Sequence, residues 1–452
     1  MFSKRIPAFV SVALLLLAAC GSTTAPSSGG TSAPAMGATA GVAAPQGGAL
    51  TVWTKFNDQN PQNDQDKWLA ATIAAAKTDA GLTITNVTQD YAQINSKLNL
   101  AVTSGGDIPD LSYIDSQQLG FFIKNGTLED LTDYVKSAPW YSDLNPAALK
   151  ACTAPDGKIY CVPGNLNSRL TYYWTERWPN GFPADTEAFL KEAARLKQEH
   201  PNEYAITFKG SEVASVEGFY FSLIHSFGGV YADTKGKAAW ASPETAQAVA
   251  FVRALFANRY APDVALAPGF DNENPMKDGT AAAFGAGSWS YIYLNPLKSP
   301  SGAEFPADSS AVNKAFEAGK LGFAPTLAAP GKQPVTLISA SGWAIPKGSK
   351  HQELAKQFIN YLLETKRNAD YAVAYGGLPV LNSSYADARF QTPYWKFVKE
   401  NQDKYGAPIE PLTDYDKALT KLAETINKLV LNTNADILTE LKAAQDAYNA
   451  GQ

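Results

Sequence analysis

Three aromatic side chains, Trp289, Tyr291 and Tyr293, follow a glycine-rich segment that contains Gly285 and Gly287. Because glycine carries no side chain, another molecule or segment can approach the backbone beside Trp289. An indole at the mouth of a turn offers a flat apolar face and one N–H donor, and the C–H faces of a pyranose ring suit such a platform. The alternative is that Trp289 closes a hydrophobic core at the end of a strand, and these residues alone leave both interpretations open.

Carboxylate and amide side chains follow two strand-like segments earlier in the chain. Asn57 and Asp58 come after the β-rich run 50–53, and Asp115 follows the buried run 110–114. Strands and helices alternate in this region, which predicts a parallel α/β sheet. Ligands of such sheets bind beyond the carboxyl ends of the strands, where these oxygens can accept hydrogen bonds from sugar hydroxyls. The alternative for each side chain is a cap on the following helix.

The alternation of strand and helix patterns continues through the rest of the chain. A β-rich run at 170–174 is followed by predicted helices over 186–199, 216–227, 243–256 and 351–363, and by helix from about 414 to the end. The roughly 400 residues of this region exceed one simple domain. The sequence therefore predicts an α/β fold built from two blocks.

The N-terminus has the pattern of an exported protein. Lys4 and Arg5 precede an apolar run, residues 6–19, that is too short for a permanent membrane span and is typical of a secretory signal peptide. The run ends in two alanines before Cys20, which resembles the bacterial lipobox. We expect residues 1–20 to be a lipoprotein signal peptide that ends at a lipidated Cys20. The lipid would anchor the exported protein to the outer face of the bacterial cell membrane, or hold it in the periplasm.

The segment 21–48 is dominated by Ser, Thr, Ala, Pro and Gly and carries no charge, so we expect a disordered stalk. Over the whole chain the net charge is −5, and the absence of a basic excess argues against a nucleic-acid partner. The three histidines are far apart, so no metal site is predicted. No catalytic serine or metal-protease motif and no paired acid motif stands out, and neither a catalytic residue nor a cofactor is predicted.

Cys152 and Cys161 bracket the dipeptide Asp156-Gly157, which favours a hairpin turn. The two cysteines can therefore face each other across a short ribbon. Because an exported protein meets an oxidising compartment, we predict a disulfide between them; the alternative is a pair of free thiols in a core.

Short motifs along nearly the whole chain resemble the extracellular solute-binding proteins of ABC importers, in the group that includes maltose-binding proteins. Each motif is weak alone, but their order behind a lipobox carries the resemblance. They are KLNLAVTSGGDIPD (97–110), GTLEDL (126–131), DGKIYCVP (156–163), YY before Glu176 (172–173), GG (228–229), GTAAAFGAGSW (279–289), SGW (341–343) and GLP (377–379).

The resemblance implies a two-lobed periplasmic-binding-protein fold with a multi-crossing hinge and a ligand cleft between the lobes. The crossings fall near 163–168, 339–342 and 377–381. Lobe 1 would comprise 49–165 plus 340–378, and lobe 2 would comprise 166–339 plus 379–452. The protein would be a monomer that captures a di- or oligosaccharide by lobe closure and delivers it to the permease subunits of the importer.

The resemblance also implies ligand contacts. Trp289 and Tyr173 match aromatic residues that stack on sugar, and Tyr415 lies near a third. Asn167 stands where the maltose-binding relative has a hinge carboxylate. Because an amide replaces the carboxylate here, the resemblance does not imply which sugar is bound. Asn57, Asp58, Asp115, Tyr291, Trp343 and Gly377 complete the candidate set, although Trp343 also suits packing in the hinge. The alternatives are a binding protein for a non-sugar solute, such as a peptide, polyamine or iron complex, and a secreted glycosidase with two carboxylates.

Overall fold

The computed structural model describes residues 48–410, 412 and 414–451. The predicted signal peptide, Cys20 and nearly all of the predicted stalk lie outside the described residues. Within the described part of the chain, no helix is both long and apolar enough to cross a membrane.

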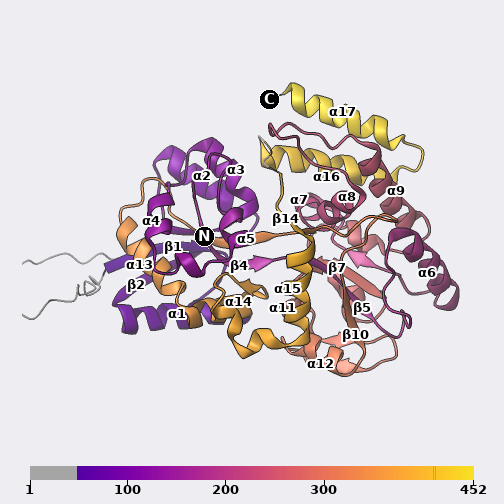
Figure 1. Cartoon of the computed structure of the whole chain (residues 1–452), viewed down its shortest axis with the longest axis horizontal. Coiled ribbons are helices and arrows are strands. Elements are labelled where there is room, and N and C mark those ends of the chain that lie inside the picture. Colours follow the sequence, from indigo (N-terminus) through magenta and orange to yellow (C-terminus); the bar gives the residue numbers. More distant parts are fainter. Residues whose placement is uncertain (1–47, 411, 413, 452) are drawn as a thin grey trace, which may run out of the picture. The chain divides into compact units, whose positions relative to one another are not determined.

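The first sheet has six strands, in the order β13 (Leu378–Pro379), β4 (Val162–Asn167), β12 (Ser339–Ala344), β3 (Leu111–Asp115), β1 (Gly48–Thr54) and β2 (Leu82–Thr88). Figure 1 labels β1, β2 and β4 of this sheet. β1 runs parallel to β2 and β3, as the alternation of strand and helix predicted, whereas β12 is antiparallel to β3 and β4. Leu50 and Val52 of β1 are each 1% exposed, so the alternate residues of this strand face the core.

Helices from two distant parts of the sequence pack around the first sheet. α1 begins at the side chain of Asn63, which accepts a hydrogen bond from the N–H of Asp66, and it ends at Gly81 in the left-handed conformation. The helices are α1 (Asp64–Ala80), α2 (Ile94–Ser104), α3 (Leu119–Asn125), α4 (Thr132–Ser137), α5 (Pro146–Ala151), α13 (Gln352–Leu362) and α14 (Thr365–Tyr375).

The second sheet has four strands, in the order β10 (Leu321–Ala324), β5 (Arg169–Trp174), β7 (Ala283–Gly287) and β6 (Thr207–Phe208). β5 is antiparallel to both β7 and β10, whereas β6 and β7 are parallel. The predicted helix 216–227 is α8 (Phe221–Phe227) preceded by a π-helical turn, Val216–Tyr220.

The remaining elements follow this sheet in the chain or pack beside it. Two further strand pairs are short: β8 (Leu297–Lys298) with β9 (Glu304–Phe305), and β11 (Thr336–Leu337) with β14 (Gly406–Ala407). The helices are α6 (Thr186–Glu199), α7 (Glu212–Ser215), α9 (Pro243–Ala257), α10 (Asn274–Lys277), α11 (Ser290–Tyr293), α12 (Ala311–Glu317), α15 (Pro393–Tyr405), α16 (Tyr415–Leu431) and α17 (Ile437–Ala450).

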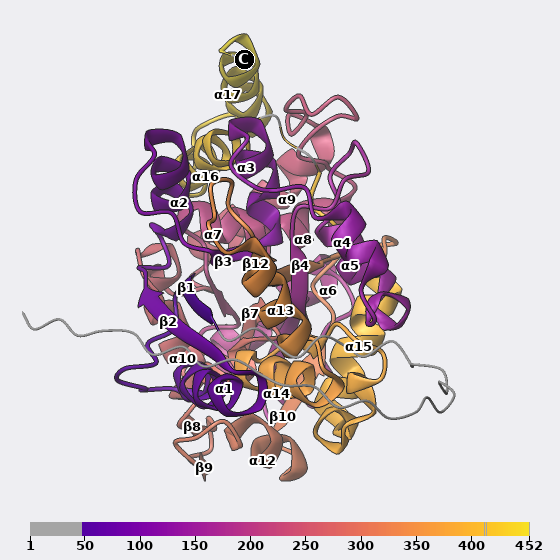
Figure 2. The same cartoon turned by 90° about the vertical axis from the view of Figure 1, so that its left-hand side faces the viewer.

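The three segments predicted as hinge crossings lie on neighbouring strands of the first sheet. Ser339 of β12 pairs with Asn167 of β4, and Leu378 of β13 pairs with Leu166; Figure 2 shows β4 beside β12. A single residue, Ser168, separates β4 from β5, so the chain passes directly from one sheet to the other. The exact boundaries of the two lobes stay a prediction.

The disulfide prediction is confirmed. Cys152 and Cys161 are bonded, with their Cα atoms 5.1 Å apart. Between them Thr153 pairs with Ile159 in an antiparallel bridge, and Gly157 takes the left-handed conformation (φ 83°) that the tight turn requires.

We expect Gly377→Ala to lower the free energy of unfolding by about 1–3 kcal/mol, because the added methyl overpacks the hinge. A Cβ there would lie 2.5 Å from Nδ2 of Asn165 and 2.8 Å from both Oδ1 of Asn167 and the carbonyl of Leu166. Urea denaturation measures the change. Gly106→Ala is the control, since its Cβ would meet nothing closer than 3.6 Å; an equal loss in both variants would contradict the prediction.

Candidate functional site

The indole of Trp289 lies folded back against the end of β7. A Cβ on Gly287 would come within 2.2 Å of the indole carbons, so glycine at 287 is what allows this position. Gly285 instead makes room for Phe219, 3.0 Å from the place of its absent Cβ. The Trp289 ring is half-buried, and among the described residues its N–H has no hydrogen-bond acceptor. The guanidinium carbon of Arg169 lies 4.3 Å from the ring centroid.

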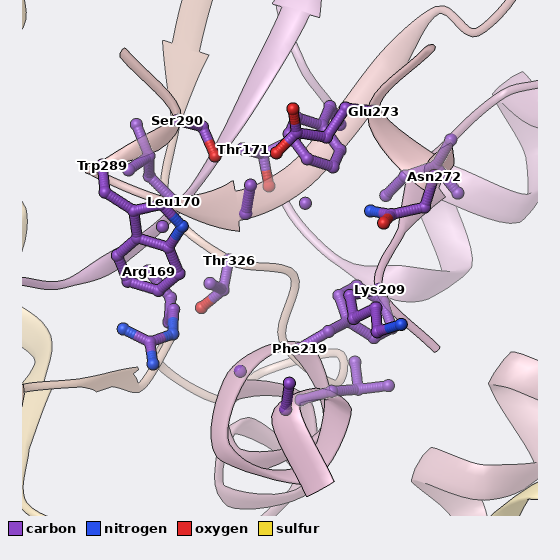
Figure 3. A pocket seen from close by; sticks show the side chains of 18 of the residues that line it. Arg169, Leu170, Thr171, Lys209, Phe219, Asn272, Glu273, Trp289, Ser290 and Thr326 are labelled. Carbon is purple, nitrogen blue, oxygen red and sulfur yellow. The ribbon is translucent and has the colours of Figure 1, made fainter. Parts of the chain in front are cut away.

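A pocket of about 730 Å³, including space open to solvent, adjoins this indole (Figure 3). It is lined by residues of the second sheet and its loops. Aromatic rings of Trp289, Phe219 and Phe270 line it together with polar side chains, which are Arg169, Thr171, Lys209, Asn272, Glu273, Ser290 and Thr326. Apolar rings beside a few polar groups are typical of a small-molecule site.

The π-helical turn carries three site residues. Phe219 and Gly218 line the pocket, and Phe219 stacks on Phe208 with ring centroids 3.9 Å apart. Glu217 accepts hydrogen bonds from Tyr415 and Gln118. A π turn inserts one residue into a helical turn and re-aims the side chains around it. The sequence pattern predicts an ordinary helix over 216–227 and gives no sign that these residues face a pocket.

Asp115 is the centre of a polar cluster at the end of β3. Its carboxylate accepts hydrogen bonds from Tyr113 (2.6 Å), Ser341 (2.7 Å) and Tyr91 (3.0 Å). The nearby charge of Asp115 and then burial raise the pKa of Tyr91 well above its ordinary value, so this hydroxyl remains a proton donor. The Tyr375 hydroxyl joins the cluster at 2.7 Å from that of Tyr113.

Lys55 brings a cation to the same cluster. Its ammonium lies 4.5 Å from the ring centroid of Tyr91 and 4.8 Å from that of Tyr375, and it donates to the Tyr375 hydroxyl at 3.2 Å. Burial acts to lower the pKa of Lys55, but the charges of Tyr375 and Asp115 outweigh it and leave the pKa above its ordinary value. Lys55 is therefore charged at neutral pH.

Glu217 links the two sheets. Its Oε1 accepts hydrogen bonds from Tyr415 of α16 (2.8 Å) and from Gln118, which follows β3 (3.3 Å). Burial raises the pKa of Glu217 to about 7, the charge of Asp115 adds to the rise, and the Tyr415 hydrogen bond and the Arg169 charge oppose it. The carboxylate is therefore poised to change charge near neutral pH.

Arg169 joins this polar contact to the pocket. It donates from Nη2 to the backbone carbonyl of Glu217 at 2.9 Å. Nε and Nη1 are buried without a hydrogen-bond partner in the described part of the chain, and the residue is only 5% exposed. Burial lowers the pKa of Arg169 to about 10, so the group remains a cation at neutral pH.

The structure brings several predicted residues to this region. Trp289 lines the pocket, Asp115 and Tyr415 belong to the polar contact, and Asn167 and Gly377 adjoin each other in the hinge strands. Oδ1 of Asn167 accepts hydrogen bonds from Asn165 (3.2 Å) and from Ser288 (3.5 Å), next to Trp289. The hinge amide therefore positions the backbone beside the indole.

Other predicted residues lie outside the pocket. Trp343 is fully buried in the first core beside Phe358 and Tyr371, which matches its alternative of hinge packing. The ring of Tyr173 packs on Phe182 with centroids 5.5 Å apart, and Tyr291 stacks on Tyr394 at 4.8 Å.

The pair Asn57 and Asp58 forms a turn after β1. The side chain of Asn57 accepts from the backbone of Asn60, and Asp58 accepts from Asn86 at 2.8 Å. Neither is the cap of α1. Among the described residues, no group of three His, Cys, Asp or Glu side chains is placed to hold a metal ion.

The chain belongs to the family of bacterial extracellular solute-binding proteins, whose sequence pattern matches residues 71–396. One similar protein is the diacetylchitobiose binding protein DasA of Streptomyces coelicolor. Its sequence is 26% identical to this one over 356 residues, which cover 75% of each chain. Two solved structures share the two-lobed fold. The GacH receptor of Streptomyces glaucescens has a TM-score of 0.74 at 18% identity, over 89% of this chain and 97% of that one. Maltose-bound MalE3 of T. maritima has a TM-score of 0.72 at 17% identity, over 89% and 100%.

We expect Glu217→Gln to reduce the fall in stability with rising pH. In the folded protein the Glu217 pKa is about 7, above its ordinary value of 4.5. Between these values the folded state holds a proton that the unfolded chain releases, so this contribution to stability is lost as pH rises from 4.5 to 7. Urea unfolding of Glu217→Gln and of the unaltered protein at pH 5, 6, 7 and 8 measures the difference, since these pH values cover most of the interval between the two pKa values.

A second variant, Asp115→Asn, separates the causes of the shift. Removing the Asp115 charge should lower the pKa of Glu217 and move the pH-dependent loss of stability to lower pH, while the nearby Asp416 charge remains. An unchanged pH profile in Glu217→Gln would show that Glu217 does not titrate in this range.

Proposed function

We propose that the protein captures a carbohydrate, a di- or oligosaccharide, by closing its two lobes, and delivers it to the permease of an ABC importer. The observation that carries this proposal is the half-buried indole of Trp289, which lines the pocket with an unpaired N–H. Flat aromatic faces suit the C–H faces of a sugar ring. The hydroxyls of Thr171 in β5 and of Ser290 at the start of α11, which line the same pocket, suit its hydroxyl groups.

The polar contact between the sheets supports closure around a ligand. Asp115 ends β3 of the first sheet and Gln118 follows it, whereas Arg169 begins β5 of the second sheet, Glu217 lies in the π-helical turn and Tyr415 begins α16. A ligand that reached from the pocket to these groups would be held by both lobes, which is the hinge closure of periplasmic binding proteins. In this role the protein binds and releases its ligand without chemical change.

The names of similar proteins support the same class of ligand but not one sugar. The sequence relative is named for diacetylchitobiose, and the solved structures hold acarbose or maltose. We therefore infer that the ligand is a carbohydrate, and these names do not identify which one. The proposal includes export and a lipid anchor at Cys20, which places the protein on the outer face of the membrane.

A thermal-shift screen against mono- and oligosaccharides tests the ligand class. A sugar present at 100 times its Kd should stabilise the protein by about 2.7 kcal/mol. Trp289→Leu should weaken binding by about tenfold or more, because burying one large apolar side chain contributes about 1.5–3 kcal/mol. Calorimetric titration of the folded variant measures this loss.

Trp53→Leu is the matched control, since it also removes a half-buried indole, but from β1 and away from the pocket. Equal loss of affinity in both variants would argue against a direct role of Trp289. A shift with peptides, polyamines or iron complexes and none with sugars would refute the carbohydrate proposal. Hydrolysis of the sugar during the assay would indicate that the protein is a glycosidase instead.

The lipid anchor has its own test. Cys20→Ser removes the thiol that carries the acyl chains, so the protein expressed in a bacterial host should move from the detergent phase to the aqueous phase of a Triton X-114 partition. Ser22→Ala should partition like the unaltered protein. Detergent-phase recovery of Cys20→Ser equal to that of the unaltered protein would contradict a lipidated Cys20.

A further inference from the structure

The pocket beside Trp289 is more apolar than an unsubstituted sugar ring requires. Its lining includes the apolar side chains of Ile206, Phe219, Leu223, Phe284 and Leu327. A pyranose with a hydroxyl on each free carbon would place some of these hydroxyls against the apolar walls. A hydroxyl buried without a hydrogen-bond partner is costly, so the part of the ligand that enters here carries an apolar substituent.

Two of the three charged groups that line the pocket, Lys209 and Glu273, already have protein partners, whereas Nε and Nη1 of Arg169 have none among the described residues. Lys209 donates to Glu212 at 2.6 Å and to the carbonyl of Ala267 at 3.3 Å. The carboxylate of Glu273 pairs with Lys277 at 3.2 Å. Neither Lys209 nor Glu273 needs a counter-charge from the ligand, so the side of the pocket that they share with Asn272 favours a neutral substituent (Figure 3). Arg169 lies on the other side, over the Trp289 ring, where its free N–H groups can donate to sugar oxygens.

The side-chain amide of Asn272 is a polar group without a partner. The residue is 3% exposed, lines the pocket and faces it from the side opposite Trp289 (Figure 3). Within the described residues its Oδ1 is buried without a donor, and its Nδ2 makes no hydrogen bond to the protein. Its backbone carbonyl is used, since it accepts from Thr207 at 2.7 Å. The buried Oδ1 needs a donor from the ligand, and the free Nδ2 can donate to an acceptor on the same group.

We propose that the ligand is an N-acylated amino sugar whose acetamido group enters this pocket. A secondary amide has one N–H and one carbonyl, which complement the two halves of the Asn272 amide, and its methyl group suits the apolar wall at Phe219. The sugar ring then lies against Trp289, within reach of the Thr171 and Ser290 hydroxyls. This inference rests on the proposed carbohydrate function and narrows it to one class of sugar.

Binding of matched disaccharides tests the inference. N,N′-diacetylchitobiose, cellobiose and deacetylated chitobiose share one β-1,4-linked skeleton and carry acetamido, hydroxyl and ammonium groups at the same carbon. Calorimetric titration should give a Kd for the acetylated sugar about tenfold to a hundredfold below the Kd of the other two. Maltose is included as a neutral sugar of different linkage.

The variant Asn272→Asp keeps the shape of the side chain but replaces the amide donor with a carboxylate. It should lose at least about tenfold in affinity for diacetylchitobiose and gain affinity for deacetylated chitobiose, whose ammonium groups pair with a carboxylate. Trp289→Leu, in contrast, should weaken acetylated and unacetylated sugars alike. Circular dichroism melts establish that each variant is folded before titration.

The outcomes separate this inference from the function on which it rests. Equal or tighter binding of cellobiose, maltose or deacetylated chitobiose would overturn the acetamido assignment while leaving a carbohydrate-binding protein. The same holds if Asn272→Asp retains the full preference for diacetylchitobiose. No binding of any of the four sugars, together with binding of a peptide or polyamine, would overturn both.

Discussion

The burial of Arg169 beside Trp289 is the constraint on which the rest of the site depends. Arg169 is the first residue of β5, and the hydroxyl of Thr336 is hydrogen-bonded to both its backbone N–H and its carbonyl. Its guanidinium lies over the indole and donates to the carbonyl of Glu217. Because a buried charge is costly once its partners are removed, the hinge, the indole and the π-helical turn are held together as one unit.

The hinge strands also carry the site. β4 leads directly to Arg169, β12 brings Ser341 to the carboxylate of Asp115, and the segment before β13 places Gly376 against the backbone of Trp289. A Cβ on Gly376 would lie 2.9 Å from the Trp289 Cα, so the two segments touch through their main chains. Since these strands are neighbours in one sheet, a small rotation about them changes the separation of Asp115 and Glu217 without unfolding either sheet.

Local pattern was enough to predict much of the fold. The apolar runs 50–53 and 110–114 predicted β1 and β3 within a few residues, because each run is short and apolar and ends at turn-forming polar residues. The disulfide followed from one hairpin signal between Cys152 and Cys161. Trp289 followed from its glycine neighbours, and the absent Cβ of Gly287 is the space that the indole occupies.

The rest of the site depends on packing that the local sequence does not encode. Tyr173 lies on the same face of β5 as Thr171, but Phe182, which comes from a loop, covers its ring. Glu217 and Phe219 face the site because a π turn replaces an α turn, and such a change is set by tertiary contacts. The unpaired amide of Asn272 is visible only when the surroundings of the side chain are known.

Besides a shared hydrophobic core, polar contacts join the two halves of the structure, and several of them are partly exposed. They include the Gln118–Glu217 hydrogen bond at 3.3 Å, the Tyr293–Gln65 hydrogen bond at 3.3 Å and the Lys124–Asp414 ion pair at 3.0 Å, whose side chains are 48% and 28% exposed. Exposed pairs of this kind contribute about 0–1 kcal/mol each. These polar contacts therefore add little to the stability of the arrangement. Under the proposed function, a ligand that bridges the pocket and Asp115 would favour closure by the difference between its affinities for the two forms.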